Sequence, residues 1–585
     1  MNRKTKRARP ETGRGDRRKV ALLSLVLAAA TLIAYANSLQ SAFVHDDRDT
    51  VVWDRHLGEF SSLTRVLLGV RGGPTGGRPL TSLTFHLNAL IAGKKPAAYR
   101  SANILIHLGA GLVLFALLCR VLAAGGGVTR RTGDVTATAF AVSLLWLLHP
   151  MQSESVTYVS QRAESLMALL FFVTVYCAIR GFRAADPLPW FLGAAVACTL
   201  SVLSKEVGVV APVVVLLYDR LLVSRGWRRA LKEHWRLYAG LAFSWLVAGL
   251  LQLTAPRGYS VGLSNPHLSP WAYLQRQFVG VTTYLTLVFW PSPLVFDYGF
   301  PPPAPSVPRS VAAAVLLAAL VGASILAARR WPLAGLAGIS FFLILAPSSS
   351  VIPILTEVLA EHRMYLPLAC VVALVVGGAV ALIRASERRG VLAAQSPVRL
   401  AGWALLFAVA GTLGFLTWQR NIVYRSELSL WQDTAAKVPD NPRAQNNLGM
   451  ALLEVGRTAE ALARFREAVV LRPGYFEANG NTALALERLG EFSEALVYMS
   501  RAVEINPESG PAHESLVRLL IRLNRWNEAL AAARAYVERL PESQRSNHLY
   551  GSLLSRMGRA KEALPYLQRA KELGSDGTAG DARLP

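Results

Sequence analysis

Long apolar runs fill the first 419 residues of this 585-residue chain and restrict what it can fold into. The chain is 52% hydrophobic, and only 17% of its residues are charged, against about 25% in a typical soluble domain. Such runs cross a bilayer as helices, because every backbone group must find its hydrogen bond within the chain there. The sequence therefore predicts an all-α, polytopic membrane bundle, followed by a region of different composition.

The first run, Val20 to about Leu39, follows a tail at 1–19 that carries nine Lys and Arg residues. The run is long enough to span and lacks a cleavage site of the Ala-x-Ala type, so we expect a retained helix and not a removed signal peptide. About eleven spans are predicted in all, the others at about 101–123, 135–149, 164–180, 188–203, 208–223, 237–254, 309–328, 332–346, 365–384 and 400–418. The apolar segment 278–290 is short, and we expect it to be re-entrant or interfacial, with both ends outside.

The net charge of +24 comes mostly from short basic clusters between the apolar runs. The positive-inside rule places such clusters in the cytoplasm, so we interpret the charge as topology and expect no nucleic-acid partner. The predicted outer loops are 40–100, 150–163, 255–308 and 347–364. All four cysteines lie inside apolar runs, which gives no zinc spacing and no disulfide framework. The prediction is a multi-pass protein, of a bacterial inner membrane, with its N-terminus in the cytoplasm.

Four prolines lie 34 residues apart in the C-terminal region, at 439, 473, 507 and 541. This spacing is the period of the tetratricopeptide repeat, an α-solenoid of helix pairs. The units are predicted at 442–475, 476–509, 510–543 and 544–577, within a region from 426 to 577 and before a flexible tail at 578–585. A half-unit at 427–438 is expected to cap the stack, and the concave face is expected to bind a peptide or partner protein.

Polar residues gather at the outer ends of the predicted spans, where charges near lipid are costly. The acidic pair Asp46 and Asp47 follows the first span, and a solvated helix cap is the alternative reading of such a pair. Taken alone, His149 is more typical of a packed, hydrogen-bonded histidine than of a catalytic one. The remaining candidates are Arg78, Glu154, Arg162, Glu164, Lys205, Glu206, Glu361, His362 and Arg363.

The order of these residues resembles the transmembrane and tetratricopeptide repeat-containing O-mannosyltransferases and their bacterial relatives. The resemblance rests on Phe43–Asp47, on 78–85, on His149 with Glu154 and Arg162, on 204–206 and on 360–367. It implies a GT-C glycosyltransferase fold, an isoprenoid-phosphate sugar as donor, and transfer of a mannose or similar hexose to a protein hydroxyl outside the cytoplasm. The family's acidic pair maps onto Asp46 and Asp47. This chain departs from the eukaryotic pattern at His362, where Arg is usual, and in having only four repeats.

Transfer from a lipid-linked sugar phosphate needs a carboxylate to accept the acceptor's proton and cations to stabilise the departing phosphate. We expect Asp46 or Asp47 to be the base, with mutual repulsion raising one of their pKa values. Arg162, Lys205 and Arg363 are the predicted phosphate ligands, supported by Arg78, His149, Glu154, Glu164, Glu206, Glu361 and His362.

Catalysis without a metal is preferred, although Asp46, Asp47 and Asp49 offer oxygen ligands suited to Mg²⁺ or Mn²⁺. The competing hypothesis for the whole protein is a non-enzymatic membrane scaffold whose repeats recruit an envelope-assembly or export machine.

Overall fold

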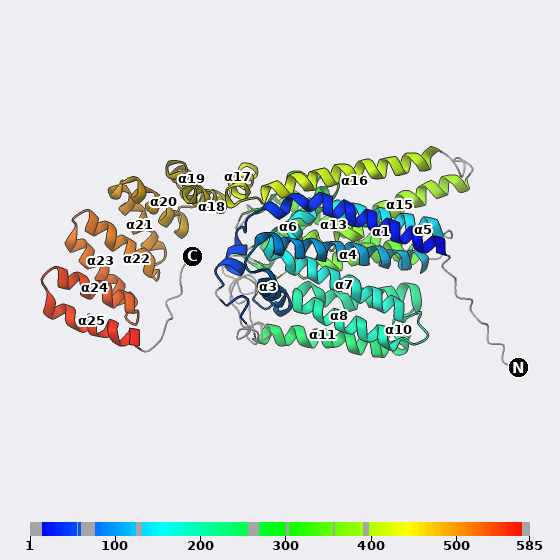
Figure 1. The fold of residues 1–585 in the computed structure, drawn as a ribbon, viewed down its shortest axis with the longest axis horizontal. Helices are drawn as coiled ribbons and strands as arrows, with labels where there is room; N and C mark the ends of the chain where they lie inside the picture. The colour runs from blue at the N-terminus through cyan, green and yellow to red at the C-terminus, as the bar shows by residue number, and fades with distance from the viewer. Residues whose placement is uncertain are drawn as a thin grey trace. The chain divides into compact units, whose positions relative to one another are not determined.

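The computed structural model describes residues 14–54, 56–59, 76–124, 132–254, 268–299, 304–350, 352–354, 357–389 and 397–575. The described residues form helices and connecting turns, without a β-strand (Figure 1). The all-α prediction is therefore confirmed. The chain divides into two compact units, 1–430 and 431–585. The basic tail was predicted at 1–19 and the flexible tail at 578–585; most of the first and all of the second lie outside the described residues.

The first unit is a bundle of long apolar helices joined by short turns. Proline stands in the first turn of many of them, where its missing N–H leaves no bond unmade. The helices are α1 (Arg14–Tyr35), α3 (Pro79–Ala92), α4 (Pro96–Ala124), α5 (Thr132–Leu148), α6 (Ser153–Thr157), α7 (Arg162–Gly181), α8 (Leu188–Ser204), α9 (Ala211–Tyr218), α10 (Trp227–Glu233), α11 (Trp235–Thr254), α12 (Pro270–Phe289), α13 (Val307–Arg330), α14 (Pro332–Leu345), α15 (Leu368–Arg388) and α16 (Pro397–Val423). Short 3-10 or π turns lie between them: η1 (Ala36–Gln40), η2 (Arg48–Val52), η4 (Pro150–Gln152), η5 (Val159–Gln161), η6 (Glu206–Val210), η7 (Asp219–Val223) and η8 (Glu361–Met364).

Seven of these helices are long and apolar enough to cross a membrane, or up to nine if each of two bent helix pairs forms one span. The bent pairs are α5 with the 150–157 segment and the 206–223 segment with α10. Two shorter apolar helices, α8 and α14, lie at other predicted spans. The described helices thus agree with a multi-pass bundle, and the predicted number of about eleven spans stays a prediction.

Helix α12 corrects the expectation of a short apolar segment at 278–290. It has 20 residues and begins at Pro270, because the Ser269 hydroxyl caps it by accepting a bond from the Ala272 N–H. Near its start, Tyr273 donates to the Ser348 carbonyl, and near its end, the Val288 carbonyl lies 3.0 Å from His149 Nε2. Ser348 and His149 follow the ends of α14 and α5 and belong to the same end of the bundle. These contacts agree with a segment that has both ends on one side.

The bundle has two chemically different ends. One end, here called the polar end, holds the residues that follow α1, α5 and α8 and precede α7 and α15; η8 packs there on η4 and α6. At the opposite end Arg384 pairs with Asp134 at 2.8 Å, and His234 with Asp219 at 2.7 Å. Figure 1 shows α3 at the polar end and α10 at the opposite end. The apolar core between the two ends joins α1, α4, α5, α7, α8, α9 and α15.

The second unit consists of antiparallel helix pairs. After α17 (Glu427–Lys437), the pairs are α18 (Pro442–Glu454) with α19 (Thr458–Leu471), α20 (Phe476–Leu489) with α21 (Phe492–Ile505), α22 (Gly510–Arg522) with α23 (Trp526–Arg539), and α24 (Gln544–Arg556) with α25 (Ala560–Ser575). A Cβ atom at Gly449 would lie 2.5 Å from the Phe465 ring, so the close approach of the first pair requires glycine.

A polar side chain recurs six residues after each period proline and donates to that proline's carbonyl. The donors are Gln445, Asn479, His513 and Asn547, at 2.7 to 3.0 Å. Each bond gives a donor to a carbonyl in the turn between two helices. The four repeats therefore share, besides their length, a bond that joins each unit to the segment before it.

Candidate functional site

The first loop turns sharply at His45, whose φ of +49° is unusual for a residue other than glycine. The His45 N–H donates to Glu427 at 2.8 Å, and the Asp47 N–H donates to the Val44 carbonyl at 3.0 Å. These two bonds hold the turn, which directs the neighbouring aspartates into different surroundings.

Asp47 is fully buried, and its carboxylate accepts several hydrogen bonds. The Ser160 N–H and hydroxyl donate to one oxygen at 2.7 and 2.8 Å, and the N–H groups of Val44 and Val159 donate to the other at 3.3 and 3.4 Å. Burial raises the pKa of Asp47 to about 6, opposed by the charge of Arg100 and by the Ser160 bonds. Burial, and not the expected repulsion within the acidic pair, is the main cause of this shift.

Asp46 keeps 37% of its side chain exposed. Its backbone N–H donates to the Tyr158 hydroxyl at 3.1 Å, and its carboxylate hydrogen-bonds to the same hydroxyl. Burial, with the charges of Asp46, Asp47 and Glu357, raises the pKa of Tyr158 well above its usual value. The Tyr158 hydroxyl thus lies close to the first loop and to a carboxylate of the loop at 347–364.

Arg100 and Arg162 are buried cations that hold the polar end together. Arg100 donates to the carbonyls of Ser41, Ala42 and Thr157. Arg162, a predicted phosphate ligand, donates to Asn103 at 2.7 Å, to the Tyr99 carbonyl at 2.9 Å and to Thr84 at 3.4 Å.

The Arg162 guanidinium carbon also lies 4.4 Å from the centre of the Phe85 ring. Its side chain is 1% exposed, so its N–H groups face protein atoms in this structure.

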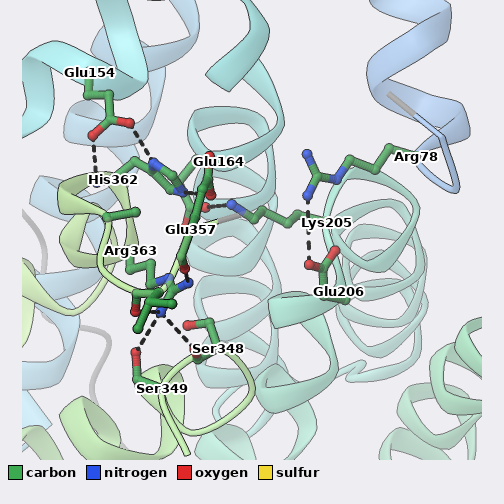
Figure 2. A network of polar contacts seen from close by, with 12 residues as sticks. Arg78, Glu154, Glu164, Lys205, Glu206, Ser348, Ser349, Glu357, His362 and Arg363 are labelled. Carbon is green, nitrogen blue, oxygen red and sulfur yellow. Dashed lines mark hydrogen bonds and ion pairs between the residues drawn. The ribbon is translucent and has the colours of Figure 1, made fainter. Parts of the chain in front are cut away.

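His362 lies between two carboxylates (Figure 2). Its backbone N–H and its Nδ1 contact the two oxygens of Glu154 at 3.0 and 2.7 Å, and its Nε2 lies 3.4 Å from Glu357. Burial alone would lower the pKa of this imidazole, but Glu154 and Glu357 outweigh burial and raise it to about 9. A pKa in this range makes His362 a cation at neutral pH.

Arg363 donates almost entirely to backbone carbonyls. Its Nη1 bonds the carbonyls of Ser348 and Val358 at 2.9 and 3.2 Å, and its Nη2 bonds the Glu357 carbonyl. The Tyr273 hydroxyl is a further partner at 3.3 Å. This predicted phosphate ligand is 5% exposed and fixes the backbone that carries Glu357.

Two further ion pairs belong to the polar end, and both lie on the same side of His362 in Figure 2. Lys205, at the end of α8, pairs with Glu164 in the first turn of α7, and both side chains are less than 10% exposed. Arg78 pairs with Glu206 at 3.7 Å, and 40% of the Glu206 side chain is exposed. Figure 2 shows Lys205 extending toward Glu164, near Glu357 and His362.

Glu361 and His149 have internal partners. Glu361 is buried and accepts from the Val295 N–H at 2.5 Å and from the Tyr298 hydroxyl at 2.9 Å. Burial raises the pKa of Glu361 to about 7, with Arg420 opposing the rise and Glu154 adding to it. His149 caps the turn at Pro150 by accepting from the Met151 N–H, and its Nε2 faces the Val288 carbonyl. His149 is thus a packed, hydrogen-bonded histidine, as expected for this residue taken alone.

The structure therefore gathers part of the predicted set. Glu154, Glu164, Lys205, His362 and Arg363 meet around one further carboxylate, Glu357. Arg162 belongs to a separate buried cluster on Asn103 and Tyr99, and His149 packs on α12.

Sequence reasoning missed Glu357, Tyr158, Ser160 and Arg100. Glu357 carried a signal, because it is the one charged residue between 347 and 360 in a predicted outer loop. Arg100 also carried one, since it stands at the start of an apolar run. Tyr158 and Ser160 carried none, because uncharged polar residues are common in such loops.

No group of three His, Cys, Asp or Glu side chains in the described part of the chain is arranged to hold a metal ion. Carboxylates at the polar end contact cations, hydroxyls or backbone N–H groups instead. The arrangement offers acid–base groups and cations beside a partly exposed loop.

Comparison with known proteins finds similar chains and matching repeat models. Tetratricopeptide-repeat models match residues 428–476, 446–510, 486–557 and 544–573. The chain is 28% identical over 518 residues to the protein O-mannosyl-transferase Tmtc3 of Drosophila melanogaster, which covers 76% of this chain and 54% of the relative. It is 23% identical over 479 residues to the protein O-mannosyl-transferase F38B6.6 of Caenorhabditis elegans, covering 77% of this chain and 63% of the relative.

A shorter match, 29% identical over 217 residues, covers 35% of this chain and 24% of the protein O-mannosyl-transferase TMTC2 of Homo sapiens. Among solved structures, MamA is 20% identical over 26% of this chain and 87% of its own, with a TM-score of 0.24.

Fold and matches together define a multi-helix, membrane-type unit joined to tetratricopeptide repeats. The chain is similar to proteins named O-mannosyl-transferases, in line with the resemblance that its motifs indicate. It spans about half the length of the Drosophila relative.

Proposed function

We propose that this protein is an integral-membrane glycosyltransferase that moves mannose or a similar hexose from an isoprenoid-phosphate donor to a protein hydroxyl. The observation that carries the proposal is the meeting of Lys205, His362 and several carboxylates at the polar end of a membrane-type bundle. The relatives named O-mannosyl-transferases support the class of reaction. The GT-C class of the bundle and the extracytoplasmic position of the polar end belong to the same proposal.

Asp46 is the better candidate for the base. An acceptor hydroxyl must reach the carboxylate, and Asp46 is 37% exposed whereas Asp47 is buried and already accepts four hydrogen bonds. Asp47 then acts as a positioning residue that fixes the turn through Ser160. Tyr158, bonded to the Asp46 backbone and carboxylate, orients the base.

The proposed sugar transfer needs only the donor, the acceptor hydroxyl and the base. The acceptor oxygen forms a bond to the anomeric carbon while the bond from that carbon to the phosphate oxygen breaks, and the acceptor proton passes to Asp46. The isoprenyl phosphate leaves with one more negative charge than the donor carried, so a nearby cation lowers the barrier. In-line displacement inverts the anomeric centre. We assign this role to Lys205 and His362. Arg162 and Arg363 each donate to several fixed protein oxygens, whereas Nε2 of His362 faces the partly exposed carboxylate of Glu357.

The tetratricopeptide repeats are proposed to bind the acceptor protein or a partner. Repeats of this type stack into surfaces that bind peptides and proteins, and the overlapping matches of the family models cover 428–573. The alternative of a non-enzymatic scaffold rests on the same repeats and gives the buried ion pairs of the first unit a structural role only. Catalysis without a metal belongs to the proposal, and a divalent cation on Asp46, Asp47 and Asp49 is the alternative to it.

The test uses membranes that contain the full chain, supplied with a labelled isoprenyl-phosphate sugar. Wild-type membranes should label protein, and Asp46→Asn should reduce the rate at least about a hundredfold, the usual contribution of a general base. Glu233→Gln, which changes an exposed carboxylate paired with Arg229 at the opposite end, is the control and should keep the wild-type rate. A wild-type rate for Asp46→Asn would refute the assignment of the base, and the absence of labelling by wild-type membranes would favour the scaffold.

A further inference from the structure

The Glu357 carboxylate lies where two cations of the polar end meet. It is 3.4 Å from His362 Nε2, and the positive charges of His362, Lys205 and Arg363 all act on it. Although desolvation opposes its ionisation, these charges lower the pKa of Glu357 well below its usual range. Glu357 is therefore an anion held among cations.

The other two carboxylates of the cluster each pair with one cation. Glu154 holds Nδ1 of His362 at 2.7 Å, and Glu164 holds Lys205. Both carboxylates are less than 6% exposed and are fixed on α6 and α7. Glu357 is different, because 42% of its side chain is exposed and it comes from the loop before η8 (Figure 2).

The charges of the cluster indicate which of its carboxylates can leave most easily. Lys205, His362 and Arg363 supply three positive charges, and Glu154, Glu164 and Glu357 supply three negative ones. Glu154 and Glu164 have direct, buried contacts, and breaking these would leave charges unpaired in a low-dielectric site. Glu357 has one longer contact, so it is the anion that can leave at least cost.

We propose that Glu357 is a displaceable counter-ion that occupies a phosphate-binding site formed by Lys205 and His362. The ligand is a lipid-borne phosphate, either the monoanionic phosphodiester of the donor or the product isoprenyl phosphate; the inference rests on the proposed function for this ligand class. When the phosphate binds, it takes the place of the Glu357 carboxylate, which turns toward solvent. Glu154 stays on His362 and keeps the imidazole protonated, so the site remains cationic after Glu357 leaves.

This arrangement makes Glu357 a competitor of the phosphate. A carboxylate tethered beside the site lowers the apparent affinity for donor and product alike, because each must displace it. The same competition speeds release of the product. Arg363, which bonds the Glu357 carbonyl, keeps the backbone in place while the side chain moves.

The test measures binding of citronellyl phosphate, a short isoprenyl phosphate, to the purified full chain in detergent at pH 7.5. Glu357→Gln keeps the side-chain length but removes the charge, and it should bind about tenfold more tightly than wild type, a factor equal to roughly 1.4 kcal/mol. Glu357→Asp keeps the charge but withdraws it by one methylene, and its affinity should lie between the two. Lys205→Gln should lose most of the binding. The matched control is Glu59→Gln, since Glu59 also contacts a histidine, His56, at 3.0 Å and is half exposed.

Equal affinity of Glu357→Gln and wild type, or weaker binding by the variant, would overturn the inference, as would a change of the same size in Glu59→Gln. Sugar transfer is measured in parallel. If Glu357→Gln binds more tightly but wild-type membranes transfer no sugar, the phosphate site stands and the proposed reaction fails. If wild-type membranes transfer sugar and Glu357→Gln loses transfer without binding more tightly, Glu357 is a catalytic residue and the counter-ion role is wrong.

Discussion

His362 Nδ1 lies 2.7 Å from Glu154 Oε1, and the His362 N–H donates to the other oxygen of the same carboxylate. The bond joins two segments separated by more than two hundred residues, since Glu154 lies in the first turn of α6 and His362 belongs to η8. One carboxylate thus fixes both the backbone and the ring of the histidine, and Glu357 approaches the remaining ring nitrogen.

Because of these contacts between Glu154 and His362, we expect the free energy of unfolding to depend on pH. The pKa of His362 is raised from 6.5 to about 9 in the folded chain, so the folded state holds more protons than the unfolded state between these values. The resulting stabilisation, up to about 3 kcal/mol, is fully present below pH 6.5 and is lost as the pH rises through 9.

Thermal unfolding in detergent between pH 6.5 and 9.5 measures the effect. His362→Arg places a cation there that does not titrate in this range, so its midpoint should fall less than that of the wild type. Parallel curves for the two proteins would show that the histidine charge contributes nothing to folding.

The two aspartates of the first loop should separate in their effects. Asp47→Asn turns an amide N–H₂ toward the N–H groups of Val44 and Val159, which leaves buried donors facing each other. We expect a loss of about 1–3 kcal/mol in the free energy of unfolding. Asp46→Asn, at a partly exposed position, should unfold within about 0.5 kcal/mol of wild type. Chemical or thermal unfolding checks both variants, and a larger loss in Asp46→Asn than in Asp47→Asn contradicts the assigned roles.

The sequence was enough to predict the all-α class and the repeats, but not α3 or the full length of α12, and only part of the site. Apolar runs and the 34-residue proline period are signals repeated along the chain, so single exceptions do not hide them. Membership of the ion cluster depends instead on where loops far apart in sequence meet. Lys205 and His362 could be selected because charges near apolar runs need partners, yet the same rule also selected Arg162 and Arg363, whose donors contact protein oxygens. Only the three-dimensional structure distinguishes these cases.

Removing one charge of the Lys205–Glu164 pair should destabilise the fold more than removing both charges. Lys205→Met leaves the Glu164 carboxylate buried without a partner, and we expect a loss of about 3–5 kcal/mol. The double variant Lys205→Met with Glu164→Leu removes both charges and should recover most of that stability.

Neither protein should transfer sugar, because each lacks the Lys205 cation. Unfolding and transfer assays on the two variants and wild type provide the check. A double variant that regains transfer together with stability would show that Lys205 is only structural.

The bond between Asn479 and the Pro473 carbonyl should stabilise its repeat locally. Asn479 is buried and donates at 3.0 Å to Pro473 and at 2.8 Å to Tyr475, so Asn479→Ala leaves two carbonyls without this donor. We expect a loss of about 1–2 kcal/mol, confined mainly to α20 and α21, because each repeat contacts only its neighbours. Hydrogen exchange of the full chain should be faster in α20 and unchanged in α4 of the first unit. Asn527→Ala, at an exposed position of α23, is the control and should leave exchange in α20 unchanged. Faster exchange in α4 would contradict the division into two separately stabilised units.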